Sequence, residues 1–144
     1  MATYNSSQYL SESLDSIIAQ TYENWELLVT DDFSSDNTLE ILQSYADKYP
    51  NISFYKSEEN NGAAVSRNNS LSKVKGRYIA FLDSDDIWRP EKLEKHLAFM
   101  KKHEAAVSFT SYGIIDDKGN NLEQIVDKND LGVISYQELL CKRA

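Results

Sequence analysis

The sequence has 144 residues, a length at which one domain with a buried core is the default expectation. Hydrophobic residues make up 41% and charged residues 26%, which excludes a disordered or fibrous chain. The formal net charge of -8 argues against nucleic acid as a partner, because phosphate polymers require a basic surface. The single cysteine, Cys141, excludes an internal disulfide and fits a reducing compartment.

No apolar run approaches the roughly 18 residues of a membrane span, and no signal peptide is evident. We therefore expect a cytoplasmic chain without a transmembrane segment, and leave peripheral membrane association open for the full-length protein.

Apolar residues alternate between helical and strand spacing along the chain, which predicts an α/β domain with a mostly parallel sheet. Asn5 or Ser6 is expected to cap the first helix. After position 105 the pattern changes to a hairpin, with a turn at 117–120 and a short helix from Ser135. The expected helices in the earlier part cover 6–20, 36–49, 63–74 and 90–103, and the expected strands cover 25–30, 52–55 and 77–82.

We expect one domain over 1–144, in which 1–104 forms a ligand-binding core and 105–144 forms the hairpin and short helix. In parallel sheets joined by right-handed crossovers, ligands bind at the carboxyl ends of the strands. Three polar clusters are predicted to lie at those ends: Thr3-Tyr4-Asn5, Thr30-Asp31-Asp32, and Asp83-Ser84-Asp85-Asp86.

The third cluster has three carboxylates within four residues, which repel one another unless a cation or hydrogen-bond donors are present. Oxygen ligands suit Mg or Mn, and one or two carboxylates suffice where a diphosphate supplies further oxygens. The alternative is a solvated turn in which Asp86 caps the next helix. An EF-hand is excluded, because Trp88 replaces the glycine of the sharp turn.

The other polar residues have two interpretations each. Asp31 or Asp32 can accept a hydrogen bond from a nucleobase, or can cap the following helix. The small residues around Gly62 start a helix whose N–H groups favour an anion, and Arg67 adds a charged fork, although an ordinary loop and a surface arginine also explain them. Tyr4 can stack on a base, and Trp88 can line a sugar pocket or belong to the core.

Four blocks in order carry a resemblance to a known family: Ala2-Thr3-Tyr4-Asn5, Val29 to Asp36, Asn61-Gly62 through Arg67-Asn68, and Phe81 to Asp86. The chain resembles the family-two inverting glycosyltransferases with a GT-A fold, over the region up to about Glu94. The resemblance implies a site for a nucleoside-diphosphate sugar. It implies nucleoside contacts from Thr3, Tyr4 and the adjacent Asn5, base contacts from Asp31 or Asp32, and base or diphosphate contacts from Arg67.

The same resemblance implies that Asp83 and Asp85 hold ribose and a divalent metal, Mn or Mg, with Asp85 as the favoured metal ligand. The metal would neutralise the diphosphate leaving group while an acceptor hydroxyl attacks the anomeric carbon. UDP is the expected nucleotide, whereas the saccharide or lipid-linked acceptor is not determined.

The chain departs from the family pattern at both ends. The family's first apolar strand is nearly absent before Ala2, and the acceptor-binding half with its general base does not follow. We therefore expect a chain that binds donor weakly and transfers poorly, and whose exposed strand edges promote formation of a homo-oligomer.

Two alternatives remain open from the sequence. A response-regulator receiver domain would use Asp31 and Asp32 for Mg and Asp83 for the phosphoryl group, but no lysine closes a strand after Thr110. A non-catalytic nucleotide-binding module would bind donor without turnover.

Overall fold

The computed structural model describes residues 1–117 and 119–126. The chain forms two compact units, one of them Met1–Phe99 and the other beginning at Met100. The first unit contains every residue of the three polar clusters, so it is the unit that concerns the site. The short helix expected from Ser135 and the thiol of Cys141 lie outside the described residues.

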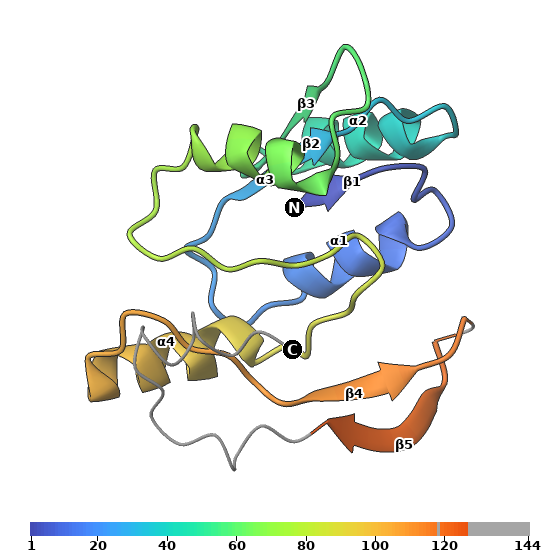
Figure 1. Ribbon diagram of the computed structural model, residues 1–144. Helices are drawn as coiled ribbons and strands as arrows, with labels where there is room; N and C mark the ends of the chain where they lie inside the picture. The colour runs from blue at the N-terminus through green and yellow to red at the C-terminus, as the bar shows by residue number, and fades with distance from the viewer. Residues whose placement is uncertain (118, 127–144) are drawn as a thin grey trace. The chain divides into compact units, whose positions relative to one another are not determined.

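The first unit is built on a three-stranded parallel sheet in the order β1-β2-β3 (Figure 1). The strands are β1 Ala2–Thr3, β2 Leu27–Asp31 and β3 Ile52–Lys56. β1 pairs with β2 through Ala2 opposite Thr30, and β2 pairs with β3 along its whole length. The α/β prediction and its parallel sheet are therefore confirmed, and β1 is as short as the sequence indicates.

Three helices cover the sheet: α1 Leu10–Ile18, α2 Thr38–Lys48 and α3 Ala63–Leu71. α2 packs against β3 and against α1, whereas α3 packs against β1 and β2 on the opposite face (Figure 1). α1 and α2 connect successive strands along the sheet in one direction, and right-handed crossovers place both helices on the same face. The chain then returns after β3 through α3 on the other face. The main core side chains are Leu10, Leu14, Ile17, Leu27, Val29, Leu42, Ile52 and Leu82.

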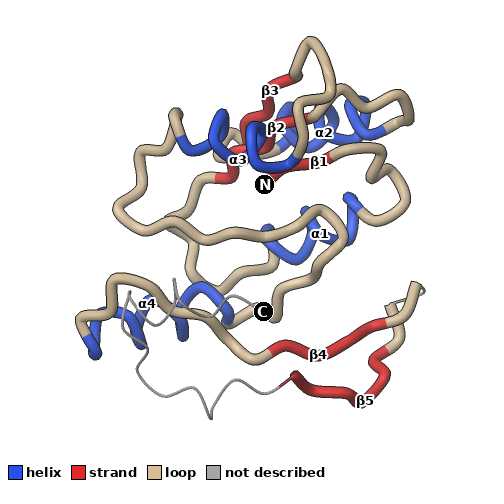
Figure 2. Tube along the Cα trace, viewed as in Figure 1, coloured by secondary structure: helices blue, strands red, loops and turns tan. Residues whose placement is uncertain are grey.

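The strand predicted over 77–82 is wrong. The chain from 72 to 91 is neither helix nor strand and is drawn as loop in Figure 2. Within 77–82 only Leu82 enters the core, whereas Ile79 and Phe81 are more than half exposed. A strand requires a neighbour that supplies ladder hydrogen bonds, and an apolar sequence alone does not supply one. The neighbouring edge strand, β1, has only two residues to offer.

The predicted cap of the first helix is also wrong. α1 starts after Tyr9, which makes no side-chain capping bond. Asn5 has a positive φ of 48°, and its side chain accepts a hydrogen bond from the Ser35 amide instead. The polar side chain is thus used to hold a distant loop rather than the nearest helix.

The helix expected to end at His103 is α4, Lys92–His103, and no residue of it is buried. The predicted hairpin consists of β4 Tyr112–Ile115 and β5 Asn121–Val126, which pair antiparallel. Within the described part of the chain, no helix is long and apolar enough to cross a membrane.

Candidate functional site

The carboxyl end of β1 presents a buried hydroxyl and an exposed ring. Thr3 is 3% exposed, and its Oγ1 has no hydrogen-bond partner among the described residues. The next residue, Tyr4, is 52% exposed. A buried hydroxyl without a protein partner costs about 1–3 kcal/mol and is rare in folded proteins, so Thr3 Oγ1 is a candidate to bond a ligand or a water molecule. Thr3 is therefore the strongest local sign of a binding site.

Asp31, at the end of β2, is completely buried. Its carboxylate accepts hydrogen bonds from both the amide and the hydroxyl of Ser34, which closes the turn after the strand. The acid that contacts the start of α2 is a different one: Asp36 accepts bonds from the amide and hydroxyl of Thr38. The interpretation of Asp31 as the cap of the following helix is therefore wrong, and its contact with a nucleobase stays a prediction.

Asp32 joins β2 to the start of α3. Its Oδ1 accepts hydrogen bonds from the Asn61 amide and the Ser66 hydroxyl, both at 3.0 Å, and its Oδ2 accepts one from the Gly62 amide at 2.8 Å. The anion at this helix start is thus the carboxylate of Asp32. Gly62 precedes α3 with φ +86°, a conformation that disfavours side chains, so the glycine allows its N–H to face Asp32.

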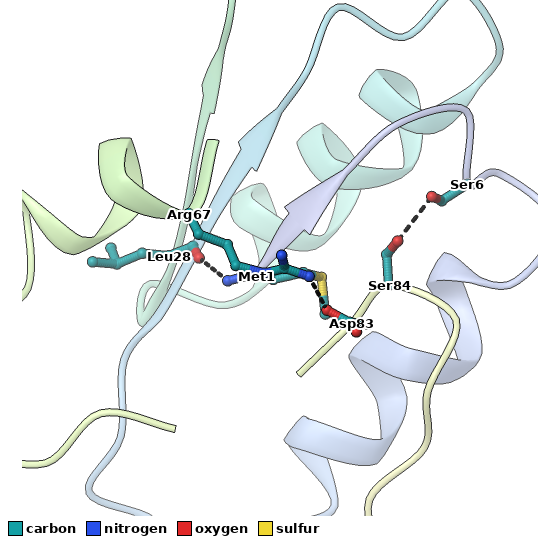
Figure 3. Close-up of polar contacts among 6 residues, drawn as sticks. All are labelled: Met1, Ser6, Leu28, Arg67, Asp83 and Ser84. Atoms are coloured by element: carbon teal, nitrogen blue, oxygen red, sulfur yellow. Dashed lines mark hydrogen bonds and ion pairs between the residues drawn. The ribbon is translucent and has the colours of Figure 1, made fainter. Parts of the chain in front are cut away.

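Arg67 and Asp83 form an ion pair between α3 and the acidic turn. Arg67 Nη2 lies 2.6 Å from Asp83 Oδ1, and both side chains are substantially exposed, at 36% and 54% (Figure 3). The Met1 amino group lies nearby and donates a 2.8 Å hydrogen bond to the Leu28 carbonyl. Burial and the charge of Arg67 lower the pKa of this amino group to about 6, against an opposing effect of Asp83. The ion pair therefore brings together the segment that contains Arg67 and the acidic cluster, which are separate in the sequence.

The acidic turn itself holds two further carboxylates. Asp86 N donates to the Asp83 carbonyl at 3.2 Å, which closes the turn, and Asp85 is exposed. Burial raises the pKa of Asp86, and the charges of Asp85 and Asp83 raise it further. A cation would relieve this repulsion.

The acidic turn could supply only part of the ligands of a metal ion. No group of three His, Cys, Asp or Glu side chains in the described ranges converges to hold a metal ion. Asp83 and Asp85 supply hard oxygen ligands, which fits a Mg or Mn ion whose remaining ligands come from a diphosphate and water.

A hollow of about 570 Å³ beside the start of α3 does not suit phosphate groups. Its lining includes the carboxylates of Glu58 and Glu59, together with Ser57, Asn61, Val65 and Asn69. Negative charge at this wall repels a diphosphate, so Arg67 is the better candidate for that contact.

Sequence reasoning missed several small polar residues. Ser6, Ser13, Ser16 and Gln20 contact the segment from Ser84 to Leu93, and Asp36 connects the loop before α1 to α2. A sequence signal was present for three of them. Ser13 and Ser16 recur at helical spacing between the apolar residues of α1, and Gln20 continues this spacing just after the helix, which indicates a second buried face.

The comparisons with known proteins agree with this geometry. The profile of the family described as Glycosyl transferase family 2 matches residues 1–138. The chain is 42% identical over 124 residues to the putative teichuronic acid biosynthesis glycosyltransferase TuaG of Bacillus subtilis, covering 86% of this chain and 49% of that protein. It is 44% identical over 117 residues to the Escherichia coli UDP-Glc:alpha-D-GlcNAc-diphosphoundecaprenol beta-1,3-glucosyltransferase WfgD, covering 81% of this chain and 46% of WfgD.

Solved structures give the same result. S. aureus TarS in complex with UDP-GlcNAc superposes with a TM-score of 0.67 at 36% identity, covering 72% of this chain and 30% of TarS. The mannosyltransferase PcManGT from Pyrobaculum calidifontis, in complex with GDP-Man and Mn2+, gives a TM-score of 0.63 at 26% identity, covering 80% of this chain and 34% of PcManGT.

The chain belongs to glycosyl transferase family 2, and its fold is that of the GT-A glycosyltransferases. It spans about half the length of the curated relatives that it matches.

Proposed function

We propose that this chain binds a nucleoside-diphosphate sugar, with UDP as the nucleotide, at the carboxyl ends of β1 and β2, as the donor-binding part of an inverting glycosyltransferase. The observation that carries the proposal is the buried Thr3 hydroxyl without a protein partner, beside the exposed Tyr4 ring. A nucleoside offers hydroxyl and carbonyl oxygens to the Thr3 hydroxyl, and a flat base that can stack on the Tyr4 ring.

The roles of the remaining residues follow from position and charge. Arg67 would contact the diphosphate or the base, since its guanidinium is partly exposed and extends from the middle of α3 toward Asp83. A base contact by Asp31 or Asp32 would replace one of the hydrogen bonds that each now accepts. Asp32 is the better placed of the two, because two of its partners are the amides of Asn61 and Gly62 in another loop, whereas Asp31 closes its own turn. Asn5 supports the site by holding the loop at Ser35.

Asp85 and Asp83 are the proposed ligands of a divalent ion, Mg or Mn, and Asp83 would also contact the ribose. Asp85 is exposed, and Asp83 becomes available once Arg67 turns toward the diphosphate. When bound, the ion would neutralise the charge that develops on the diphosphate leaving group. In the transfer, an acceptor hydroxyl oxygen bonds to the anomeric carbon from the face opposite the diphosphate, the bond from that carbon to the diphosphate breaks, and a base accepts the hydroxyl proton.

The relatives support the choice of nucleotide. TarS is solved with UDP-GlcNAc and WfgD is named for UDP-Glc, whereas the complex of PcManGT contains GDP-Man with Mn2+. UDP with Mn is therefore the first combination to test, and GDP is the informative comparison.

A thermal-shift titration with UDP, GDP and CMP, each with and without Mn, tests the proposal. We expect the largest rise in melting temperature with UDP and Mn, and loss of the Mn-dependent part in Asp85→Asn. Asp47→Asn is the matched control, because Asp47 is an exposed acid in the last turn of α2. A chain that shifts with none of the nucleotides would overturn the proposed function.

A non-catalytic nucleotide-binding module predicts the same shifts but no turnover. Hydrolysis or transfer from a UDP-sugar, followed as UDP release, separates the two functions. The receiver-domain alternative is set aside, because the chain belongs to glycosyl transferase family 2 and the carboxylate of Asp31 is fully buried in its own turn.

A further inference from the structure

The acidic turn Asp83–Asp86 lies within a stretch, 72–91, that has no helix or strand to fix its shape. The bond from the Asp86 amide to the Asp83 carbonyl is a local turn contact and does not attach the turn to the rest of the unit. Backbone groups that leave water need partners, and in a loop these come from side chains of other elements. The position of the acids must therefore be set from outside the loop.

α1 and the residues after it supply these partners. The Ser13 hydroxyl donates to the Asp86 carbonyl at 2.6 Å, and the Trp88 amide donates to the Ser16 hydroxyl at 3.1 Å. Gln20 uses both ends of its amide, donating to the Arg89 carbonyl and accepting from the Leu93 amide, each at 2.9 Å. Ser13 and Ser16 lie three residues apart on α1, and Gln20 follows four residues later just after the helix ends, so the three side chains form one polar face along α1 and its C-terminal end.

This polar face is buried. Ser13 is 1% exposed, Gln20 5% and Ser16 8%, although serine and glutamine are usually found at the surface. The apolar side chains of α1 pack in the core around Val29 and Leu42. α1 thus has two buried faces, one that packs in the core and one that holds the loop carrying the acids.

A further contact holds the turn from the other side. The hydroxyls of Ser6 and Ser84 share a hydrogen bond of 2.8 Å (Figure 3). Ser6 also donates to the Tyr4 carbonyl at 3.2 Å. Asp85 lies between Ser84 and Asp86, so both of its chain neighbours are fixed while its own side chain is exposed. The same contact ties the acidic turn to the loop that carries Tyr4.

We propose that Ser6 and Ser13 are positioning residues of the donor site: together they clamp Asp85 so that its carboxylate meets a divalent ion at the diphosphate, and Ser16 and Gln20 continue the clamp along the loop. This inference rests on the proposed function. It assigns to α1 a role in metal-dependent donor binding, which a helix that only packs would lack.

The expected effect is specific for the metal. Residues that orient a metal-binding carboxylate change metal affinity by about 10- to 100-fold when they are removed. Contacts to the nucleoside from Thr3 and Tyr4 come from the loop after β1, whereas Ser13 lies on α1 and its hydroxyl bonds to the loop that carries the acids. Loss of the Ser13 contact should therefore reduce the gain in UDP affinity produced by Mn and leave uridine binding unchanged, whereas Ser6→Ala also removes a hydrogen bond to the Tyr4 carbonyl.

The test compares Ser6→Ala and Ser13→Ala with wild type by calorimetric titration of UDP with and without Mn, and of uridine. We expect the UDP dissociation constant without Mn, divided by the constant with Mn, to fall about 10-fold in each variant. Ser6→Thr keeps the hydroxyl at a half-exposed position and should restore the ratio. Ser44→Ala is the matched control, because Ser44 is an exposed helix serine that donates only to its own helix, at the Ile41 carbonyl.

Hydrogen exchange gives a readout that needs no ligand. In Ser13→Ala, the amides of 84–89 should exchange about fivefold faster than in wild type, as expected for one lost hydrogen bond, while β2 keeps its protection. If Ser13→Ala fails to fold, Ser84→Ala removes the Ser6 contact from the partner side and takes its place.

The outcomes separate the two proposals. Wild-type protein that binds no UDP under any condition contradicts the proposed function and this inference with it. Mn-dependent UDP binding that is equal in wild type, Ser6→Ala and Ser13→Ala overturns the clamp alone and leaves the donor site standing.

Discussion

The Arg67 guanidinium donates a 2.6 Å hydrogen bond to Asp83 Oδ1, and this contact joins α3 to the acidic turn. In the absence of donor, the cation expected to meet a diphosphate is thus neutralised by the acid expected to meet ribose and metal. Donor binding would separate the pair and give each side chain a stronger partner.

This arrangement predicts that Arg67→Lys affects binding much more than stability. Exposed ion pairs contribute about 0–1 kcal/mol, so the free energy of unfolding in urea should change by less than about 1 kcal/mol. UDP affinity should fall about 10-fold, because lysine cannot offer the two-pronged guanidinium contact. Arg77→Lys is the control, since Arg77 lies over the ring of Tyr78 and not at the acidic turn. Equal UDP affinity in both variants would remove Arg67 from the site.

Asp32→Asn tests the link between β2 and α3. The asparagine keeps one acceptor oxygen but turns an NH2 group toward the donors that now bind the carboxylate, from Asn61, Gly62 and Ser66. We expect the free energy of unfolding to fall by about 1–3 kcal/mol, measured by urea denaturation, with faster amide exchange at Asn61 and Gly62. Asp47→Asn, at an exposed acid, should leave both measurements unchanged, and a similar loss there would show that the effect is not specific.

The lowered pKa of Asp36 predicts that the stability of the folded chain depends on pH. Partial burial raises its pKa, but hydrogen bonds from Thr38 and Ser7 outweigh this effect and lower the pKa from 3.8 to about 2. A carboxyl group with a lowered pKa stabilises the folded chain above its unfolded value and loses this contribution as the pH falls through the folded value. The contribution should therefore disappear between about pH 4 and pH 2.

The measurement is urea denaturation of wild type and Asp36→Asn across that range. The difference between the two should be largest above pH 4 and should shrink toward pH 2. A difference that stays constant with pH would show that Asp36 acts without its charge.

Much of the fold could be predicted from the sequence because it depends on local periodicity. The apolar spacing of α1 and the short runs that form β2 and β3 carry enough signal to give their order, and strand-helix-strand order then dictates parallel pairing. The predicted strand over 77–82 failed because a ladder depends on the neighbouring strand, which the sequence of the segment does not contain.

Candidate site residues could be proposed from the sequence, but the hydrogen bonds that connect them could not. The acids and Arg67 were proposed from residue type, although Asp83 to Asp86 follow no strand and Arg67 lies in the middle of α3. Their partners were not, because the contacts of Asp32 with Gly62 and of Ser13 with Asp86 join residues 30 and 73 positions apart. The hydroxyl of Thr3 is distinctive only once its burial and lack of a partner are known.

Thr3→Val tests the donor site most directly, because the substitution should change stability and UDP binding in opposite directions. Valine has the shape of threonine and removes the unpaired buried hydroxyl, so the ligand-free chain should become more stable by about 1 kcal/mol in urea denaturation. UDP affinity measured by calorimetry in Mn should fall about 10-fold, since the hydroxyl would lose its ligand contact. Unchanged UDP affinity in Thr3→Val, or no measurable UDP binding by wild type, would contradict a donor site at the end of β1.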